Sequence, residues 1–197
     1  DVLVDENGEL LRALAGSSEE VFREGIRALE EAYRAPVERR PEIVVVSAGG
    51  RPHDSDFYSA HQAVDNITTL AKDRIVVVLV AECNQGHGDS TFLELLSTHK
   101  SSEDLREELR RAFSLPTQAA LRWMKIVEKH RIICVSAMPE YLASGVFRMR
   151  TTRTVGDALE AAFRLAGRNS KVLVVPSGKA IVPYVTSATA APQTMQG

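Results

Sequence analysis

The side chains that could ligate a metal or transfer a proton lie close together in this sequence. They are His53, Asp54, His61, Cys83 and His87. Imidazole and thiolate groups together suit zinc or nickel. None of these residues forms a CxxC or HxxxH pair, which would fix two ligands on one side of a turn or helix. We therefore expect no self-contained metal site, although a metal-dependent hydrolase that uses His53, Asp54 and His87 stays an open alternative.

Two glycine-rich loops contain or border these side chains. The first runs from Ala48 to Asp54 and includes Gly49, Gly50 and Arg51, and the second runs from Cys83 to Gly88 and includes Gly86 and His87. Neither loop matches the GxGxxG fingerprint or the GxxxxGK[ST] phosphate-binding loop. Nucleotide binding is therefore weakly supported by these residues alone, and tight turns between strands and helices are the plain alternative.

A polar helix face follows the first loop. Ser55, Ser59, Gln62 and Asn66 recur three or four residues apart, so they point in one direction on a helix. These side chains could hydrogen-bond a polar ligand, and a solvated helix face is the alternative. Three histidines are expected to have structural roles. His61 lies next to an apolar position of the predicted helix, and His99 and His130 lie in helix-end contexts.

The elements that position these residues form a βαβ unit. Ile43–Val46 and Ile75–Val80 are continuous apolar runs, typical of strands buried on both faces of a parallel sheet. The segment between them has an apolar stripe at helical spacing, with Asp54 or Ser55 available as its N-cap. Open α/β sheets bind ligands beyond the carboxyl ends of their strands, so we expect the working surface at the two glycine loops.

The rest of the chain extends this pattern. Ile132–Val135 and Val172–Val175 are two further buried strands, which together predict a mostly parallel α/β sheet with helices on both faces. Val2–Ala15 contains Asn7-Gly8 and predicts an N-terminal β-hairpin, an edge ribbon at one side of the sheet. A helix with an apolar face of Phe22, Ile26, Leu29 and Tyr33 should follow, then a polar linker with Pro36 and Pro41. We expect a single domain over residues 1–183 and a loosely ordered tail over residues 184–197.

Composition narrows the possible partners. The 197 residues are 44% hydrophobic and carry a formal net charge of −2, and no stretch concentrates Lys and Arg. Nucleic-acid and membrane partners are therefore not expected. The two cysteines, Cys83 and Cys134, lie in apolar strand contexts, and nothing resembles a secretory signal, which favours a cytoplasmic location. The chain begins with Asp1 in what reads as mid-strand sequence, so we expect a piece of a longer protein.

At this point the chain resembles, along most of its length, the carboxyl-terminal half of the nickel-pincer-dependent lactate racemase family. The resemblance is carried by the hairpin Val2–Gly16, the strand and loop IVVVSAGGRPHD from Ile43 to Asp54, and the strand and loop VVVLVAECNQGHG from Val76 to Gly88. It continues at Asp56-Phe57-Tyr58, Ala63-Val64-Asp65-Asn66, Lys129-His130-Arg131, Thr154–Leu159 and the KVLVVPSG segment from Lys171 to Gly178.

This resemblance implies a two-domain racemase or epimerase (an isomerase) that acts on a 2-hydroxy acid, either a small one such as lactate or a sugar acid. It implies hydride removal and return by a nickel-pincer nucleotide (pyridinium-3,5-bisthiocarboxylic acid mononucleotide nickel). In the family, the covalent lysine, the nickel-ligating histidine and the acid/base histidines lie in the amino-terminal half. We therefore expect no catalytic residue, metal ligand or bound cofactor in this chain alone, and we expect the amino-terminal domain of the same protein as its partner.

The resemblance also points to the substrate-facing residues. The family helix presents a glutamine and, three residues later, a lysine toward the substrate, and by register from Tyr58 these positions hold Ser59 and Gln62. Arg51 or Lys72 could replace the missing positive charge, and Gln118 corresponds to a position before the third strand where relatives often carry an aromatic residue or a histidine. The expected substrate-binding or cleft residues are Gly49, Gly50, Arg51, Asp54, Tyr58, Ser59, Gln62, Gly86, His87 and Gly88. The alternative is a non-catalytic binding or regulatory module of the same fold.

Overall fold

The computed structural model describes residues 1–5 and 8–186. A five-stranded parallel sheet with the order β7-β6-β5-β4-β8 forms its centre. The strands are β4 (Ile43–Ser47), β5 (Val76–Val80), β6 (Arg131–Val135), β7 (Arg150–Thr152) and β8 (Val172–Val175). The predicted parallel pairing of four apolar segments in one sheet is therefore confirmed. The strand β7 was not predicted, because its three residues, Arg-Thr-Thr, carry no apolar signal.

Alternate residues of the central strands belong to different cores. Val44 and Val46 pack in one hydrophobic cluster, while Ile43 and Val45 pack in another on the opposite face of the sheet. Since side chains alternate along a strand, both faces must be covered by apolar partners. This is the physical reason for the continuous apolar runs in the sequence.

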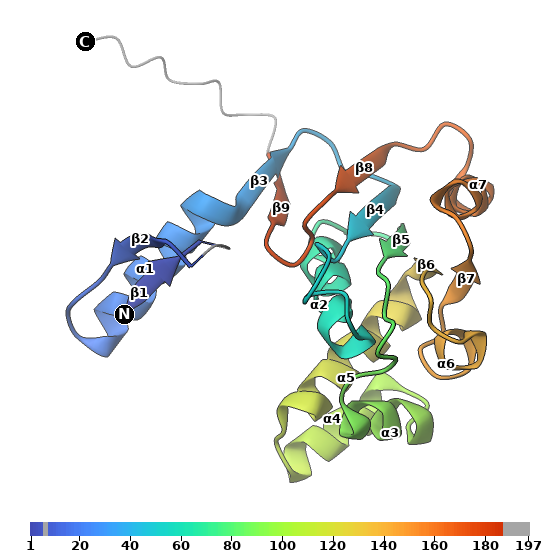
Figure 1. Cartoon of the computed structure of the whole chain (residues 1–197), viewed down its shortest axis with the longest axis horizontal. Helices are drawn as coiled ribbons and strands as arrows, with labels where there is room; N and C mark the ends of the chain where they lie inside the picture. Colours follow the sequence, from blue (N-terminus) through green and yellow to red (C-terminus); the bar gives the residue numbers. More distant parts are fainter. Residues whose placement is uncertain (6–7, 187–197) are drawn as a thin grey trace.

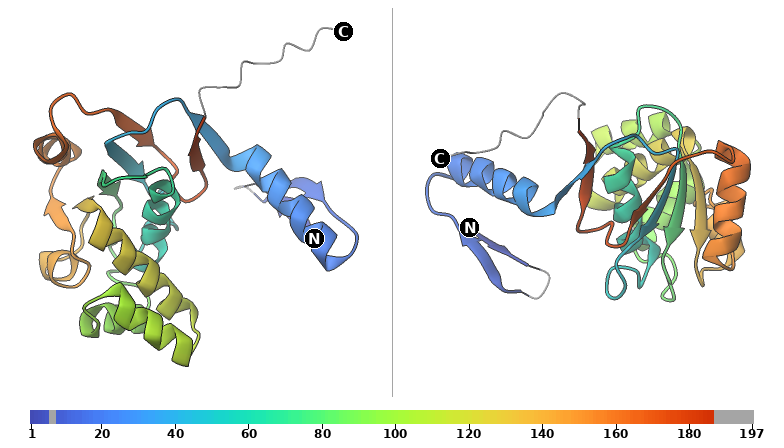
Figure 2. Two further views of the ribbon diagram at one scale, coloured as in Figure 1. Left: turned by 180° about the vertical axis from the view of Figure 1, so that it is seen from behind. Right: turned by 90° about the horizontal axis from the view of Figure 1, so that it is seen from above.

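Helices cover both faces of the sheet. The larger cluster lies under α2 (Phe57–Thr68), α3 (Ser90–Thr98), α4 (Ser102–Arg111), α5 (Leu115–Lys129) and the short α6 (Glu140–Gly145), and the smaller cluster lies under α7 (Val155–Ala166). Figure 2 shows α7 alone on its side of the sheet in the right-hand view. None of the helices in the described part of the chain has the length and apolar character needed to cross a membrane.

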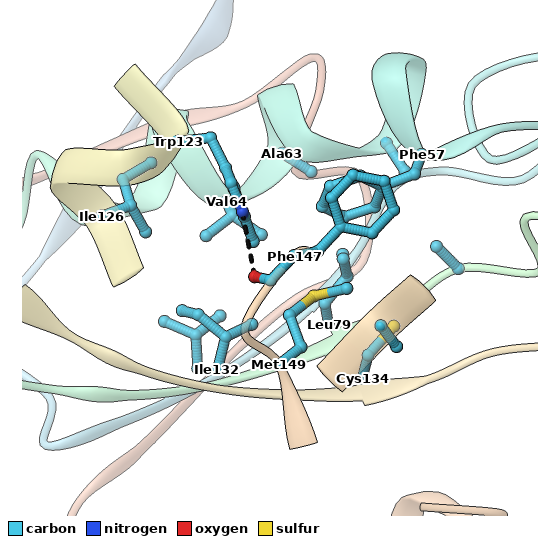
Figure 3. Packing of buried hydrophobic residues seen from close by; sticks show 14 of the residues in the cluster. Phe57, Ala63, Val64, Leu79, Trp123, Ile126, Ile132, Cys134, Phe147 and Met149 are labelled. Carbon is cyan, nitrogen blue, oxygen red and sulfur yellow. Dashed lines mark hydrogen bonds between the residues drawn. The ribbon is translucent and has the colours of Figure 1, made fainter. Parts of the chain in front are cut away.

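Aromatic side chains organise the larger core. The Phe57 ring packs against Trp123 at 4.9 Å and against Phe147 at 4.2 Å between ring centroids. The Trp123 indole Nε1–H donates to the Phe147 carbonyl oxygen at 3.1 Å, as Figure 3 shows. The predicted core position of Trp123 is confirmed, and this hydrogen bond satisfies the one polar atom that its burial would otherwise leave unpaired.

The amino-terminal hairpin does not join the central sheet. Strands β1 (Val2–Val4) and β2 (Leu10–Ala13) pair only with each other, and Figure 1 shows them beside α1 (Ser18–Tyr33), away from the main body. The predicted edge ribbon is therefore wrong, while the hairpin itself is confirmed. Its Asn7 lies outside the described residues. The expected buried face of α1 is largely open, because Phe22 is 68% exposed.

A second parallel pair ties the hairpin and α1 to the main body. Strand β3 (Arg34–Val37) pairs with β9 (Val182–Val185). The prediction of a polar linker at Pro36 is wrong, since proline is tolerated in a strand with a free edge. The strand β9 also runs past Pro183, where a loosely ordered tail was expected to begin, and residues 187–197 lie outside the described part. The domain limits themselves stay a prediction.

Candidate functional site

The two glycine loops meet at the carboxyl edge of the sheet. The strands β4 and β5 are parallel, and their last residues, Ser47 and Val80, are paired in register. The loops that follow, residues 48–56 and 81–89, therefore leave the sheet side by side. Ligands of open parallel sheets bind at this edge, so the working surface stays predicted at these two loops.

Backbone hydrogen bonds join these loops and the start of α2 into one unit. The bonds are Cys83 N to Asp54 O (2.7 Å), Gln85 N to Ser55 O (2.9 Å), Phe57 N to Gly86 O (3.0 Å) and Tyr58 N to His87 O (3.1 Å). Because Asp54 and Ser55 are engaged in this way, neither caps α2. The N-cap is Asp56, whose Oδ1 accepts from the Ser59 N–H at 2.7 Å, so the predicted cap was wrong by one or two positions.

Gly88 closes this unit tightly. It adopts a φ of +82°, and a Cβ at this position would lie 2.8 Å from the Cγ of Asp56 and 2.8 Å from the Cβ of Tyr58. Gly50 and Gly86 also have positive φ, but a Cβ there would have no neighbour within 4 Å. Gly49 faces the loop that follows β8, since its Cβ would lie 4.0 Å from the Cα of Ser177.

The charged residues of the first loop are held by the second. The Arg51 Nε lies 3.7 Å from Glu82 Oε2, and the Asp54 Oδ2 accepts from the Glu82 N–H at 3.4 Å. Asp54 Oδ1 and His87 Nδ1 are buried without a hydrogen-bond partner within the described residues. Buried polar atoms are normally paired, so these two atoms mark a place where a ligand or a partner domain could bond.

This edge offers no metal-ligand set. Among the residues that the structure describes, no three His, Cys, Asp or Glu side chains come close enough to hold a metal ion. Burial raises the pKa of Cys83 to about 11, so its thiol stays protonated and is a poor ligand and nucleophile. The hydrolase alternative based on His53, Asp54 and His87 therefore lacks a metal centre in this part of the chain.

A polar cavity of about 420 Å³ lies beside α2. It is lined by Tyr58, His61, Gln62, Asp65, Asn66, Leu115, Gln118, Ala119, Arg122 and Lys179. Tyr58 connects it to the glycine loops, because its backbone binds His87 while its side chain lines the cavity. The structure thus brings Tyr58, Gln62 and Gln118 together. Ser59 is not among the lining residues, and its Oγ donates to the Asp56 carboxylate at 3.3 Å.

Two ring-bearing side chains in this cavity are uncharged. Burial raises the pKa of Tyr58, with a smaller contribution from Asp89, so its phenol is protonated and can donate a hydrogen bond. Burial is also the main cause that lowers the pKa of His61, whose Nδ1 lies 2.5 Å from the Tyr58 carbonyl oxygen. His61 is only 4% exposed and packs against Phe92, which confirms the structural role expected for it.

Sequence reasoning missed the contribution of the loop after β8. The Asn66 Nδ2 donates to the carbonyl oxygens of Gly178 (2.9 Å) and Lys179 (3.2 Å), which fixes this loop on the polar side of α2. Gly178 packs so closely that a Cβ there would meet Val46 and would lie 3.0 Å from the Cβ of Ala63. The rule that ligand sites gather at the carboxyl ends of parallel strands could have included Lys179, because β8 ends at this edge as well.

The remaining predicted residues lie elsewhere. Lys72 follows the carboxyl end of α2 and does not line the cavity. His99 and His130 are the C-cap residues of α3 and α5, as expected. His130 does not act as a cation, however, since burial lowers its pKa to about 4 and its Nδ1 accepts from the Ile75 N–H at 3.2 Å.

Comparison with known proteins identifies the family of this chain. Residues 37–183 match the family of lactate racemase C-terminal domains. This chain belongs to that family. It is 27% identical to the lactate racemase of Thermoanaerobacterium thermosaccharolyticum over 187 residues, and 25% identical to that of Lactiplantibacillus plantarum over 191 residues.

Solved structures show the same fold. The lactate racemase apoprotein from T. thermosaccharolyticum superposes with a TM-score of 0.78 at 25% identity, and the match covers 94% of this chain and 45% of that chain. A Thermotoga maritima protein agrees in fold, with a TM-score of 0.58 at 13% identity. In sequence, 92% of this chain matches 43% and 44% of the two racemases, so it spans under half the length of these relatives.

Proposed function

We propose that this chain contributes the substrate-facing surface of an isomerase that racemises or epimerises a 2-hydroxy acid. Membership of the racemase C-terminal domain family supports this proposal, as do the curated relatives, both lactate racemases. The observation that carries it is the polar cavity at Tyr58 and Gln62, next to the carboxyl edge of a parallel sheet. Amide and phenol groups at such a site can hydrogen-bond the hydroxyl and carboxylate oxygens of a small acid.

In this proposal the redox chemistry belongs to a nickel-pincer nucleotide that is bound mainly by the amino-terminal half of the protein. The cofactor supplies a reversible acceptor for the hydride on the substrate C2. The described residues of this chain include no metal-ligand cluster, so we assign them substrate binding and orientation rather than cofactor binding. The orphaned Asp54 Oδ1 and His87 Nδ1 are suited to hydrogen bonds across the boundary between the two halves.

A second candidate is a binding or regulatory module without catalysis. It is favoured by the resemblance described above, which implies a substrate-facing lysine at the position of Gln62. A neutral amide binds a carboxylate less strongly than an ammonium group does. The two candidates differ in whether the full-length protein converts a 2-hydroxy acid at all.

The test follows a deuterium label at C2. The full-length protein that contains this chain, loaded with the cofactor, is incubated in ordinary water with enantiopure [2-²H]lactate, glycerate and a sugar acid. We expect the opposite stereoisomer of at least one acid, separated by chiral chromatography, with deuterium retained at C2. Loss of the label to solvent would contradict hydride transfer. Absence of conversion of every acid by the loaded protein would favour the regulatory module.

A further inference from the structure

Lys179 is the unpaired cation of the cavity beside α2. Three charged side chains line this cavity, namely Asp65, Arg122 and Lys179. Asp65 and Arg122 neutralise one another, because the Arg122 Nε lies 2.8 Å from Asp65 Oδ2. The structure gives Lys179 no ion pair with any carboxylate of residues 1–5 and 8–186. The lining therefore has one positive charge that is available to an anionic ligand.

The backbone of Lys179 is fixed in place. The Asn66 amide donates to the carbonyl oxygens of Gly178 and Lys179, and Gly178 packs closely against Val46 and Ala63, so both contacts hold this part of the loop against the sheet and α2. A charge on a held backbone loses less conformational freedom on binding than one on a free loop. The charge of Lys179 also reaches the Tyr58–His61 end of the cavity, because it is among the causes that lower the pKa of His61, after burial.

The other cations considered for this role are unsuitable. Arg51 is paired with Glu82, and Lys72 lies at the far end of α2. Since α2 rises by about 1.5 Å per residue, its last residue, Thr68, lies roughly 15 Å along the helix from Tyr58, and Lys72 follows beyond that end. Lys179 alone among these cations shares a cavity with Gln62.

We propose that Lys179 binds the carboxylate of the substrate from the β8–β9 loop, in the cavity that it shares with Gln62. This proposal rests on the proposed function and deepens it, since it assigns the substrate orientation. With its carboxylate on Lys179, the acid places its hydroxyl groups against the amides of Gln62 and Gln118. Those amides favour 2-hydroxy acids that carry further hydroxyl groups over lactate, because they can hydrogen-bond a hydroxyl group and cannot hydrogen-bond the methyl group of lactate.

The test removes the charge from the protein and from the ligand in turn. Dissociation constants of the full-length protein for lactate, glycerate and their neutral amides are measured by isothermal titration. Lys179→Gln should weaken binding of both carboxylates by roughly 10-fold to 100-fold, as expected for loss of a charge-assisted hydrogen bond, and should change amide binding little. The double variant Lys179→Gln with Gln62→Lys should recover most of the affinity, because it returns a cation to the same cavity.

The matched control is Lys125→Gln, which removes a lysine of α5 that is exposed and lies outside this cavity. It should leave every dissociation constant unchanged. The proposal is overturned if Lys179→Gln leaves the affinity for the carboxylates unchanged, or weakens binding of the acids and of their neutral amides equally. It is also overturned if the double variant melts like the wild type but recovers no affinity, or if the wild-type protein binds neither acid.

The same variants separate this proposal from the proposed function. Acids that bind in a Lys179-dependent manner without being isomerised would leave the carboxylate site standing and refute the isomerase. If the protein isomerises an acid and Lys179→Gln leaves the KM for that acid unchanged, the proposed isomerase function stands and the carboxylate site at Lys179 is refuted.

Discussion

Gly88 is constrained both by its backbone conformation and by the lack of space for a Cβ atom. Alanine at position 88 must accept a φ of +82° and a Cβ within 2.8 Å of Tyr58. Gly86 has the similar φ of +80° but open space around it, so Gly86→Ala measures the backbone cost alone. We expect Gly86→Ala to destabilise by about 1–2 kcal/mol and Gly88→Ala by at least about 1 kcal/mol more, in urea unfolding. Equal losses would mean that the contact with Tyr58 is not tight.

His130 makes the stability of the fold depend on pH. Burial lowers its pKa from 6.5 to about 4, with smaller contributions from Lys129 and Arg74. Between these values the unfolded chain binds the proton and the folded chain does not, so stability is complete above about pH 6.5 and is lost as the pH falls toward 4. The loss should be on the order of 2–3 kcal/mol.

The control for this pH effect is His130→Asn, whose Oδ1 can accept from the Ile75 N–H without titrating. Its free energy of unfolding should fall less steeply than that of the wild type between pH 6.5 and 4. The lowered pKa of His61 contributes equally to both proteins. Identical slopes would refute the assignment of His130 as a neutral acceptor.

Individual site residues were predictable only in part. Tyr58 and Gln62 could be placed on one helix face from their spacing, and both line the cavity. Ser59 could not be excluded from it, because its hydrogen bond to Asp56 depends on which residue caps α2. Lys179 lies more than a hundred residues from Gln62 in the chain, so only the pairing of β8 with β4 brings them together.

At the scale of elements, Asn66 connects α2 to the loop between β8 and β9. Asn66→Ala removes two hydrogen bonds from the carbonyls of Gly178 and Lys179 and should destabilise the protein by about 1–3 kcal/mol. Gln62→Ala is the matched control on the same helix face, since the exposed Gln62 has no hydrogen bond within the described structure. It should stay within about 0.5 kcal/mol of the wild type in chemical denaturation. Similar stabilities of the two variants would show that the Asn66 hydrogen bonds to the β8–β9 loop contribute little to stability.

The β3–β9 pair depends on a donor at its end. The Thr186 N–H donates to the Val37 carbonyl oxygen at 3.0 Å, and proline at position 186 removes this donor. In Thr186→Pro we expect faster hydrogen exchange in β3 and β9, with β4 and β5 unchanged. Thr186→Ala keeps the backbone donor and removes only the longer bond from the Thr186 hydroxyl to the same oxygen (3.4 Å), so it should retain most of the wild-type protection. Loss of protection in β4 and β5 as well would contradict independent opening of this pair.

Elements were predictable where burial is two-sided. The strands β4, β5 and β6 and the helix between β4 and β5 follow from composition and period, because buried strands carry such apolar runs. The predicted burial of the fourth segment is wrong, since β8 lies at the edge of the sheet and its Val172 and Val174 are 39% and 62% exposed. The pair β3 and β9 was missed since each strand contains a proline and has a free edge, which gives a linker-like sequence. The place of the hairpin was also unpredictable, because its own pattern does not encode whether β1 and β2 join a larger sheet.

At the scale of the whole molecule, two of the cavities in the described structure differ most clearly in the ligand that they suit. One is the polar cavity at Tyr58, Gln62 and Lys179. The other, of about 560 Å³, lies between α1 and β9 and is lined mainly by apolar side chains such as Ile26 and Leu29. Charge complementarity favours the polar cavity for a hydroxy acid, whereas the apolar cavity suits a hydrophobic partner segment.

The most direct test of the account is a titration of the ¹⁵N-labelled chain with glycerate, followed through its amide resonances. We predict saturable shifts at Tyr58, Gln62 and Lys179 and at the neighbouring loop residue His87, which lie together at the carboxyl edge of the sheet. Saturable shifts confined to Ile26, Leu29 and β9, or no shifts up to high millimolar glycerate, would contradict the claim that this surface receives the substrate.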